Sequence, residues 1–305
     1  MTGITDGHRD DGHRPGNSNP PESGGFRIIE RLPMQASLDS IVAATRQRLL
    51  LNRRDYDLRA LERAAAAHTP RGFREQLRRV AGDKDGIAIA VIAELKKASP
   101  SRGLIRADFR PGELAGDLEQ AGATALSVLT DEQFFQGSLD YLRQASSSSS
   151  LPCLRKDFIV DELQIVEARA NRADAILLIV AALDQKELVS LAAAAKSHRL
   201  DVLCEAHDEA ELQHALDAGC DLIGINSRNL RTFEVNLETT FRLAEKIPAS
   251  CVRVAESGIQ SGADIARLRS AGYEAFLIGE SLMKAKRPAE ALAKLMEEAK
   301  MAVSR

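Results

Sequence analysis

The sequence lacks the features that mark several protein classes. Its 41 Lys and Arg residues do not outnumber its 44 Asp and Glu residues, so the net charge of -3 gives no basic surplus for binding nucleic acid. No apolar run approaches the roughly 20 residues that a helix needs to span a bilayer. Residues 1–25 contain no hydrophobic stretch of the kind that a secretory signal requires. We therefore expect a cytoplasmic protein with neither a nucleic-acid partner nor a membrane partner.

No C-x-x-C pair occurs among the four cysteines, which lie far apart in the sequence. Each of them sits in or beside an apolar run, which is typical of a buried, reduced thiol in a cytosolic protein. These cysteines are Cys153, Cys204, Cys220 and Cys251. His8 and His13 are too loosely spaced to indicate a metal-binding tract and fit a solvated tail. The sequence therefore predicts free thiols and no bound metal.

The 305 residues are enough for one α/β barrel or for two average domains. A composition of 44% hydrophobic and 28% charged residues is ordinary for a globular protein. The start of the chain differs, because it is rich in Gly, Pro, Asp, Asn and Ser and nearly free of large apolar side chains. Such a segment cannot bury enough surface to offset its chain entropy. We expect residues 1–30 to be a disordered extension and residues 31–305 to form the folded domain.

Helical patterns come first in the expected domain. Ser37 is a suitable N-cap for an amphipathic helix. The apolar stripe of this helix consists of Leu38, Ile41, Val42, Leu49 and Leu50. Two further helical stretches follow at about 57–68 and 71–80, and the pattern of the last residues predicts a closing helix at about 287–303.

Beyond residue 87, short apolar runs alternate with helical patterns. The runs are five to nine residues long and rich in Val, Ile and Leu, which suits strands buried on both faces of a parallel sheet. They span residues 87–95, 123–129, 151–155, 175–181, 201–205, 222–226, 251–255 and 275–279. Eight such strands indicate a closed (β/α)8 barrel, with an open doubly wound sheet as the alternative. No G-x-G-x-x-G follows the first strand, which disfavours a dinucleotide-binding sheet.

Polar side chains follow the ends of these strands, where the active sites of (β/α)8 barrels lie. Glu94 and Lys96 are two residues apart, so a strand presents both on one face. Lys156 likewise shares a face with Leu154, and Arg155 lies on the opposite face. Other polar strand ends carry Glu205, Asn226, Arg228, Glu256 and Glu280. A structural ion pair would explain Glu94 and Lys96 alone, but lysines and carboxylates at six strand ends predict a reactive site.

The loops after the seventh and eighth strands contain Gly258 and Gly279. In barrels of this kind the backbone N–H groups of these two loops commonly bind a phosphate, and glycine allows its oxygens to approach closely. The alternative is that these two glycines only allow the chain to turn. Phe134 and Phe135 follow the second strand, and we expect one of them in the core and the other beside a pocket for a flat apolar ring.

The segments around these residues closely resemble the indole-3-glycerol-phosphate synthase family of tryptophan biosynthesis. The resemblance covers about residues 37–300 and rests on seven motifs in order: IAELKKASPSRG, SVLTDEQFFQGS, LRKDFIV, CEAH, GINSRNL, AESGI and FLIGESLM. It implies a single (β/α)8 TIM barrel with an extra N-terminal helical segment. It also implies a carboxy-lyase, without metal or organic cofactor, that converts 1-(2-carboxyphenylamino)-1-deoxyribulose 5-phosphate into indole-3-glycerol phosphate, CO₂ and water.

The resemblance implies catalytic roles for four strand-end residues. Lys156 matches the general acid that protonates the ketone oxygen as the ring closes. Glu205 and Glu94 match two further acid–base carboxylates, and Lys96 matches a lysine that aids dehydration and neutralises substrate anions. The chemistry agrees, because this cyclisation needs an acid at the carbonyl oxygen, a base, and cations for two anionic ends. Because Lys156 is expected beside Lys96, we expect its pKa to be lowered.

The other matched residues are expected to hold the substrate. Asn226 and Arg228 match residues that position the substrate and its carboxylate, and Phe135 matches an aromatic wall. The predicted substrate-binding set is Ser99, Phe135, Asn226, Arg228 and Glu256. The predicted phosphate cradle is Ser257, Gly258, Gly279 and Glu280. Because a carboxylate aimed at phosphate would repel it, we expect Glu280 to bind through its N–H, with its side chain pointing away.

Two other functions remain as alternatives. The neighbouring isomerase, which acts on phosphoribosylanthranilate, needs a Cys/Asp acid–base pair, whereas this chain has Glu94, Lys96 and Asn226 at the relevant strand ends. A non-catalytic phosphate-binding barrel would be expected to lose the acid–base residues, which are kept here.

His207 follows Glu205 and either tunes that carboxylate or is an ordinary loop histidine. No interface motif is visible, so we expect a monomer or weak homo-oligomer whose partner is a small phosphorylated substrate.

Overall fold

The computed structural model describes residues 37–83, 88–229 and 234–303. All of them belong to the unit Pro33–Arg305. The predicted extension at residues 1–30, with His8 and His13, lies outside the described residues. Within the described ranges, no helix is long and apolar enough to cross a membrane.

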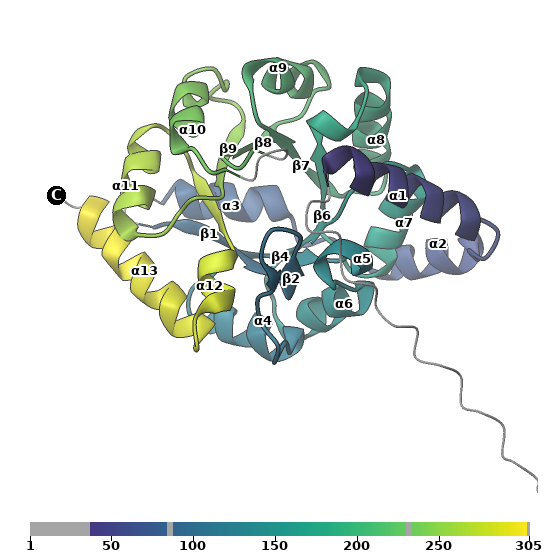
Figure 1. Ribbon diagram of the computed structural model, residues 1–305, viewed down its shortest axis with the longest axis horizontal. Helices are drawn as coiled ribbons and strands as arrows, with labels where there is room; N and C mark the ends of the chain where they lie inside the picture. Colours follow the sequence, from purple (N-terminus) through teal and green to yellow (C-terminus); the bar gives the residue numbers. More distant parts are fainter. Residues whose placement is uncertain (1–36, 84–87, 230–233, 304–305) are drawn as a thin grey trace, which may run out of the picture. The chain divides into compact units, whose positions relative to one another are not determined.

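Eight parallel strands of the described chain close into a barrel (Figure 1). Around the barrel the order is β1-β10-β9-β8-β7-β6-β5-β4, and pairing of β1 with β4 closes the ring. The strands are β1 (Ala90–Leu95), β4 (Ala125–Leu129), β5 (Cys153–Lys156), β6 (Ala175–Ile179), β7 (Asp201–Ala206), β8 (Leu222–Asn226), β9 (Val252–Glu256) and β10 (Ala275–Ile278). Each predicted run overlaps one of them, and β5, β7 and β9 each extend one residue beyond the predicted run. The closed (β/α)8 barrel is therefore confirmed, and the open doubly wound sheet is excluded.

Helices alternate with the strands on the outside of the barrel (Figure 1). They are α4 (Pro111–Gln120), α5 (Glu132–Phe135), α6 (Leu139–Ser148), α7 (Glu162–Ala170), α8 (Gln185–Ser197), α9 (Glu209–Asp217), α10 (Leu237–Ala244), α11 (Gly262–Ser270), α12 (Glu280–Lys284) and α13 (Pro288–Val303). The chain also forms a short hairpin, β2 (Ala98–Ser99) and β3 (Gly103–Leu104), in the loop after β1. A 3₁₀ turn, η1 (Val180–Ala182), replaces the end of the strand predicted to reach residue 181. Helix α13 confirms the predicted closing helix.

Three helices of the described chain precede the barrel. They are α1 (Leu38–Asn52), α2 (Leu58–Ala67) and α3 (Phe73–Ala81). Ser37 caps α1 as predicted, because its side chain accepts a hydrogen bond from the N–H of Ser40 at 3.3 Å. Ile41 and Leu49 are buried, but Leu50 is 73% exposed. The prediction that Leu50 belongs to the buried stripe is therefore wrong.

The alternation of side chains along the strands divides the core into two layers. Outward-facing residues such as Val91 pack beneath the surrounding helices. Inward-facing residues such as Ile92 fill the barrel, together with Phe73 and Leu77 of α3, which are fully buried against the starts of the strands. Glu94 follows Ile92 by two residues and so points into the same interior. Polar groups therefore begin where the apolar interior of the barrel ends.

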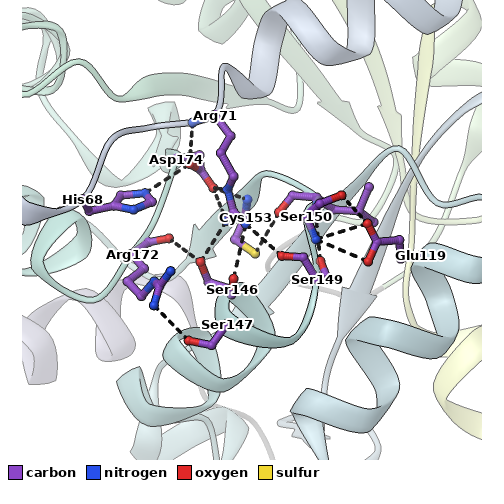
Figure 2. Close-up of polar contacts among 11 residues, drawn as sticks. His68, Arg71, Glu119, Ser146, Ser147, Ser149, Ser150, Cys153, Arg172 and Asp174 are labelled. Atoms are coloured by element: carbon purple, nitrogen blue, oxygen red, sulfur yellow. Dashed lines mark hydrogen bonds and ion pairs between the residues drawn. The ribbon is translucent and has the colours of Figure 1, made fainter.

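A buried carboxylate ties the segment before α3 to the barrel (Figure 2). Asp174 is fully buried, and its oxygens accept hydrogen bonds from Arg71 Nη2 at 2.6 Å and the backbone N–H of Cys153 at 2.6 Å, with His68 Nε2 at 3.1 Å. Arg71 also donates to the hydroxyl of Ser146 at 2.8 Å. Burial raises the pKa of Asp174, but the hydrogen bonds from His68 and Arg71 have the larger, opposite effect. The pKa of Asp174 is therefore lower than its ordinary value. This network stabilises the fold at the end of the barrel away from the strand C-termini.

The structure corrects the prediction of four free thiols. Cys204 in β7 and Cys220 just before β8 form a disulfide. Cys153 and Cys251 are free and buried, as predicted. Burial raises the pKa of the Cys153 thiol to about 12, so this group stays protonated at neutral pH.

Candidate active site

One cavity at the C-terminal ends of the strands is lined by every residue of the predicted site. Its volume is about 690 Å³. The predicted residues in its wall are Glu94, Lys96, Ser99, Phe135, Lys156, Glu205, Asn226, Arg228, Glu256, Ser257, Gly258, Gly279 and Glu280. Among the described residues, five acidic and five basic side chains line it. The lysines and carboxylates predicted at the strand ends therefore line one cavity.

Glu94 and Lys96 form an ion pair at the end of β1, in which the Lys96 ammonium donates to Glu94 Oε1. Glu94 is buried, whereas Lys96 is partly exposed at the cavity. Gly279, at the end of β10, approaches Glu94 so closely that a Cβ at position 279 would overlap the Glu94 side chain. The missing side chain at position 279 thus makes room for a carboxylate on the neighbouring strand.

Lys156, at the end of β5, is surrounded by carboxylates. Its Nζ donates to Glu205 Oε2 at 2.8 Å and lies 3.7 Å from Glu256 Oε2. Burial lowers the pKa of Lys156, but Glu205, Glu256 and Glu94 together raise it well above its ordinary value. The expectation of a lowered pKa is therefore wrong. The reason is that the negative charges of these three carboxylates outweigh the effect of burial.

Glu205, at the end of β7, receives hydrogen bonds on both oxygens. Oε2 accepts from Lys156, and Oε1 accepts from Asn226 Nδ2 at 3.1 Å. Asn226 is itself held, because its Oδ1 accepts from the backbone N–H of Arg228 at 3.0 Å. Burial opposes ionisation, but Lys156 and His207 lower the pKa of Glu205 well below its ordinary value. Glu205 is therefore an ionised carboxylate at neutral pH.

Glu256, at the end of β9, has the opposite protonation state at neutral pH. Burial, and then the negative charge of Glu205, raise the pKa of Glu256 to about 8, although Lys156 partly opposes the shift. Its carboxyl group fits beside β8 only because residue 224 is glycine, where a Cβ would overlap it. The cavity thus holds a protonated carboxyl group close to an ionised one, which is how two neighbouring carboxylates avoid mutual repulsion.

The loop after β9 makes a sharp turn at the cavity wall. Ser257 and Gly258 both lie in the left-handed region, with φ of 63° and 76°. A left-handed serine is strained, and the hydroxyl of Ser227 supports this turn by donating to the carbonyl of Ser257 at 2.9 Å. A Cβ at Gly258 would collide with Val235. This turn and the one at Gly279 border the same cavity, as the predicted phosphate cradle requires.

Glu280 connects three basic side chains at the rim of the cavity. Its carboxylate lies 3.1 Å from Arg102 Nε, 3.3 Å from Arg228 Nη2 and 2.6 Å from Lys284 Nζ. Burial raises the pKa of Glu280, but Lys284 and the two arginines have the larger, opposite effect. The pKa of Glu280 is therefore lower than its ordinary value. The side chain is therefore an ionised counter-ion for the arginine predicted to meet the substrate carboxylate.

An apolar wall faces the charged groups. Phe134 is buried and Phe135 lines the cavity, as predicted for this pair. The Phe135 ring contacts that of Phe158, with centroids 6.1 Å apart. Leu38 and Ile41 of α1 also reach the cavity. The helix before the barrel thus forms part of the wall against which an apolar ring would pack.

Some lining residues were not assigned to the site from the sequence. They include Leu38, Ile41, Arg102, Phe158 and Lys284. Arg102 and Phe158 lie within the motifs IAELKKASPSRG and LRKDFIV, so their position in the sequence could have indicated that they belong to the site. Residues of α1 and α12 line the cavity because of tertiary packing, which spacing alone does not give.

Lysine ammonium groups lie beside carboxylates of the cavity. Among the described residues, no group of three or more His, Cys, Asp or Glu side chains has the arrangement of a metal site. The ammonium groups of Lys96 and Lys156 take up the negative charge instead. Such a site can donate protons, accept protons and bind anions.

Comparison with known proteins gives a consistent result. The family model described as indole-3-glycerol phosphate synthase matches residues 38–295. An indole-3-glycerol phosphate synthase from Koribacter versatilis is 56% identical over 263 residues, which cover 86% of this chain and 100% of the relative. One from Leptothrix cholodnii is 49% identical over 264 residues, covering 86% of this chain and 99% of the relative.

Solved structures with much lower identity share the fold. A mandelate oxidase variant has a TM-score of 0.55 at 16% identity, with 80% of this chain and 93% of that chain covered. The thiamine phosphate pyrophosphorylase of Pyrococcus furiosus has a TM-score of 0.52 and covers 70% of this chain and 97% of its own. These likenesses concern the barrel alone.

Proposed function

Because this chain belongs to the indole-3-glycerol phosphate synthase family, we propose that its cavity binds 1-(2-carboxyphenylamino)-1-deoxyribulose 5-phosphate and closes the indole ring. The ring carbon that carries the carboxylate attacks the ketone carbon, and a C–C bond forms. Loss of CO₂ from that ring carbon restores the aromatic ring. The hydroxyl at the former ketone carbon then leaves as water, together with a proton from the neighbouring CH₂, to give indole-3-glycerol phosphate.

The substrate is anchored at its two ends. Its phosphate binds the turns at Ser257, Gly258 and Gly279 through backbone N–H groups, and its aromatic ring packs on Phe135. Arg228 binds the carboxylate in place of its contact with Glu280. This arrangement uses the cations of the rim for the anionic groups of the substrate and the apolar wall for its ring.

Lys156 is the general acid for ring closure. Its raised pKa keeps the ammonium group charged at neutral pH, so the proton is in place when negative charge develops on the ketone oxygen. The alkoxide that forms at that oxygen is more basic than an amine, which makes the transfer favourable. Glu205 holds the ammonium group at 2.8 Å and stabilises it between turnovers.

The other three catalytic groups serve the later steps. Lys96 donates to the departing hydroxyl group during dehydration and regains its proton from solvent, and Glu94 orients this lysine through their ion pair. Glu205, which is ionised, accepts the proton released as the pyrrole ring becomes aromatic and returns it to Lys156 across their 2.8 Å contact. The dehydration therefore uses the lysine of one ion pair and the carboxylate of the other.

One observation carries this proposal. Two lysines and two carboxylates from three different strands, β1, β5 and β7, meet in the same cavity as the two turns predicted to hold the phosphate. A barrel that only bound phosphate would not require the buried acid–base groups. An isomerase using a Cys/Asp pair would require a cysteine in the cavity wall, and none of the described lining residues is one.

Product fluorescence tests the proposal directly. The chain contains no tryptophan, so indole formation is read against a dark background. The purified protein is mixed with the proposed substrate, and indole fluorescence and released CO₂ are followed together. Equal amounts of both products are expected. Binding without either product would support the phosphate-binding barrel instead, and turnover of phosphoribosylanthranilate alone would support the isomerase.

A further inference from the structure

His207 lies directly behind the carboxylate of Glu205, outside the cavity wall. It follows β7 by one residue, and Glu211 stands on the first turn of α9. His207 Nε2 is 3.4 Å from Glu205 Oε1, and His207 Nδ1 is 2.9 Å from Glu211 Oε2. The imidazole therefore connects the helix to the catalytic carboxylate.

Glu211 holds His207 at two points. Its Oε2 also accepts a hydrogen bond from the backbone N–H of His207 at 2.8 Å. Glu211 is fixed in turn, because its own N–H donates to the side chain of Asp208, the N-cap of α9, at 2.9 Å. A carboxylate bound to both the backbone and the ring of one residue fixes the orientation of that ring.

The contacts form a line of alternating charge. From the helix to the cavity, it runs through Glu211, His207, Glu205 and Lys156. His207 is 14% exposed and Glu205 is 2% exposed, so solvent screens these interactions only weakly. The carboxylates that face His207 are Glu205 from β7 and Glu211 from α9.

We propose that His207, fixed by Glu211, is a positioning residue that keeps Glu205 ionised and aimed at Lys156. The inference rests on the catalytic role proposed above for Glu205. His207 touches no part of the cavity and acts only through that carboxylate. A protonated imidazole with both nitrogens facing carboxylates supplies the positive charge that a buried carboxylate otherwise lacks on this side.

The protonation states agree with this geometry. Burial lowers the pKa of His207, but Glu205 and Glu211 together raise it to about 10. The imidazole is therefore charged at neutral pH. Removing it should raise the pKa of Glu205, and the fraction of ionised Glu205 should fall in mildly acidic buffer.

The test is a double-mutant cycle between positions 207 and 205. In the otherwise unchanged protein, His207→Ala should lower kcat about tenfold and leave KM within about twofold, because one charge-assisted contact is lost. The acidic limb of the kcat profile should move to higher pH. His207→Gln, which keeps a hydrogen-bond donor without the charge, should recover part of kcat but not the position of the acidic limb.

In a Glu205→Gln background, the same His207→Ala change should have no further effect on the residual rate, measured in single turnovers at high enzyme concentration. His214→Ala on the exposed face of α9 is the matched control and should change neither kcat nor the acidic limb. Urea unfolding of each variant checks that the fold is retained.

The outcomes separate two failures. If His207→Ala slows both backgrounds equally, or leaves the acidic limb in place, His207 does not act through Glu205 and the inference is wrong. If Glu205→Gln itself turns over substrate at the normal rate, the proposed role of Glu205 is wrong, and the inference falls with it.

Discussion

Replacing Glu256 by glutamine should remove the alkaline loss of activity. With a pKa of about 8, Glu256 is about tenfold more protonated than ionised at pH 7 and the reverse at pH 9. At neutral pH its protonation leaves the basic side chains of the cavity wall in excess by one charge. Its ionisation cancels that excess, which disfavours a substrate that carries both a carboxylate and a phosphate.

The size of the effect follows from the charge that appears. A charge about 10 Å from another costs about 2 kcal/mol at an effective dielectric constant of about 20, so kcat/KM should fall by roughly tenfold or more between pH 7 and pH 9. Glutamine keeps the shape of the protonated side chain but cannot ionise. The kcat/KM of Glu256→Gln should therefore be nearly constant over this range.

Stability should change with the same titration. The pKa of Glu256 is raised on folding, so its contribution to stability is fully present below about pH 4.5 and is lost as pH rises through about 8. Above that pH, Glu256→Gln should be more resistant to urea than the unchanged protein. Indole fluorescence gives kcat/KM and circular dichroism gives unfolding. An alkaline limb of equal size in both proteins would refute the reasoning.

Three further predictions follow from individual side-chain contacts. Gly279→Ala should lower kcat by at least tenfold in the fluorescence assay without unfolding the protein, because its Cβ displaces Glu94, and an unchanged kcat would contradict that contact. Asp174→Asn should cost about 3–5 kcal/mol in urea unfolding, because Arg71 loses its buried partner; a cost below about 1 kcal/mol would argue against the network. Glu280→Gln should lower KM severalfold by freeing Arg228 for the substrate carboxylate, and a raised KM would show that Glu280 orients this arginine instead.

The sequence was sufficient to place the four proposed catalytic groups. Glu94, Lys156 and Glu205 each follow an inward-facing apolar residue by two positions, and Lys96 follows Glu94 by two, so strand alternation decides which way they point. The same alternation sends Arg155 outward, where it pairs with Asp157 at 2.9 Å. In a closed parallel barrel, all inward-facing residues at strand ends meet in one place, and the barrel itself was predictable from the eight apolar runs.

Other features depended on contacts between distant segments. Helix α1 brings Leu38 and Ile41 to the cavity because of how it packs, which no local pattern records. The direction of the Lys156 pKa shift depended on the three carboxylates, from other strands, that meet around it. The pairing of Cys204 with Cys220 required the spacing of β7 and β8, so the sequence alone favoured free thiols.

The disorder expected of residues 1–30 and the number of chains in the assembly remain predictions. Removal of residues 1–30 should leave kcat and KM unchanged if that segment is a disordered extension, as predicted from its composition. A monomer or a weak homo-oligomer is expected in solution, which analytical ultracentrifugation measures.

The rate of ring closure in Lys156→Ala tests the central claim most directly. Binding of a substrate analogue in which an alcohol replaces the ketone is measured first, so that loss of affinity is separated from loss of chemistry. With enzyme in excess, a single turnover of the variant should be at least about a hundredfold slower than that of the unchanged protein, because the proton donor is missing. Lys196→Ala on the surface of α8 is the control and should be unaffected. A near-normal single-turnover rate in Lys156→Ala would contradict the assignment of Lys156 as the acid.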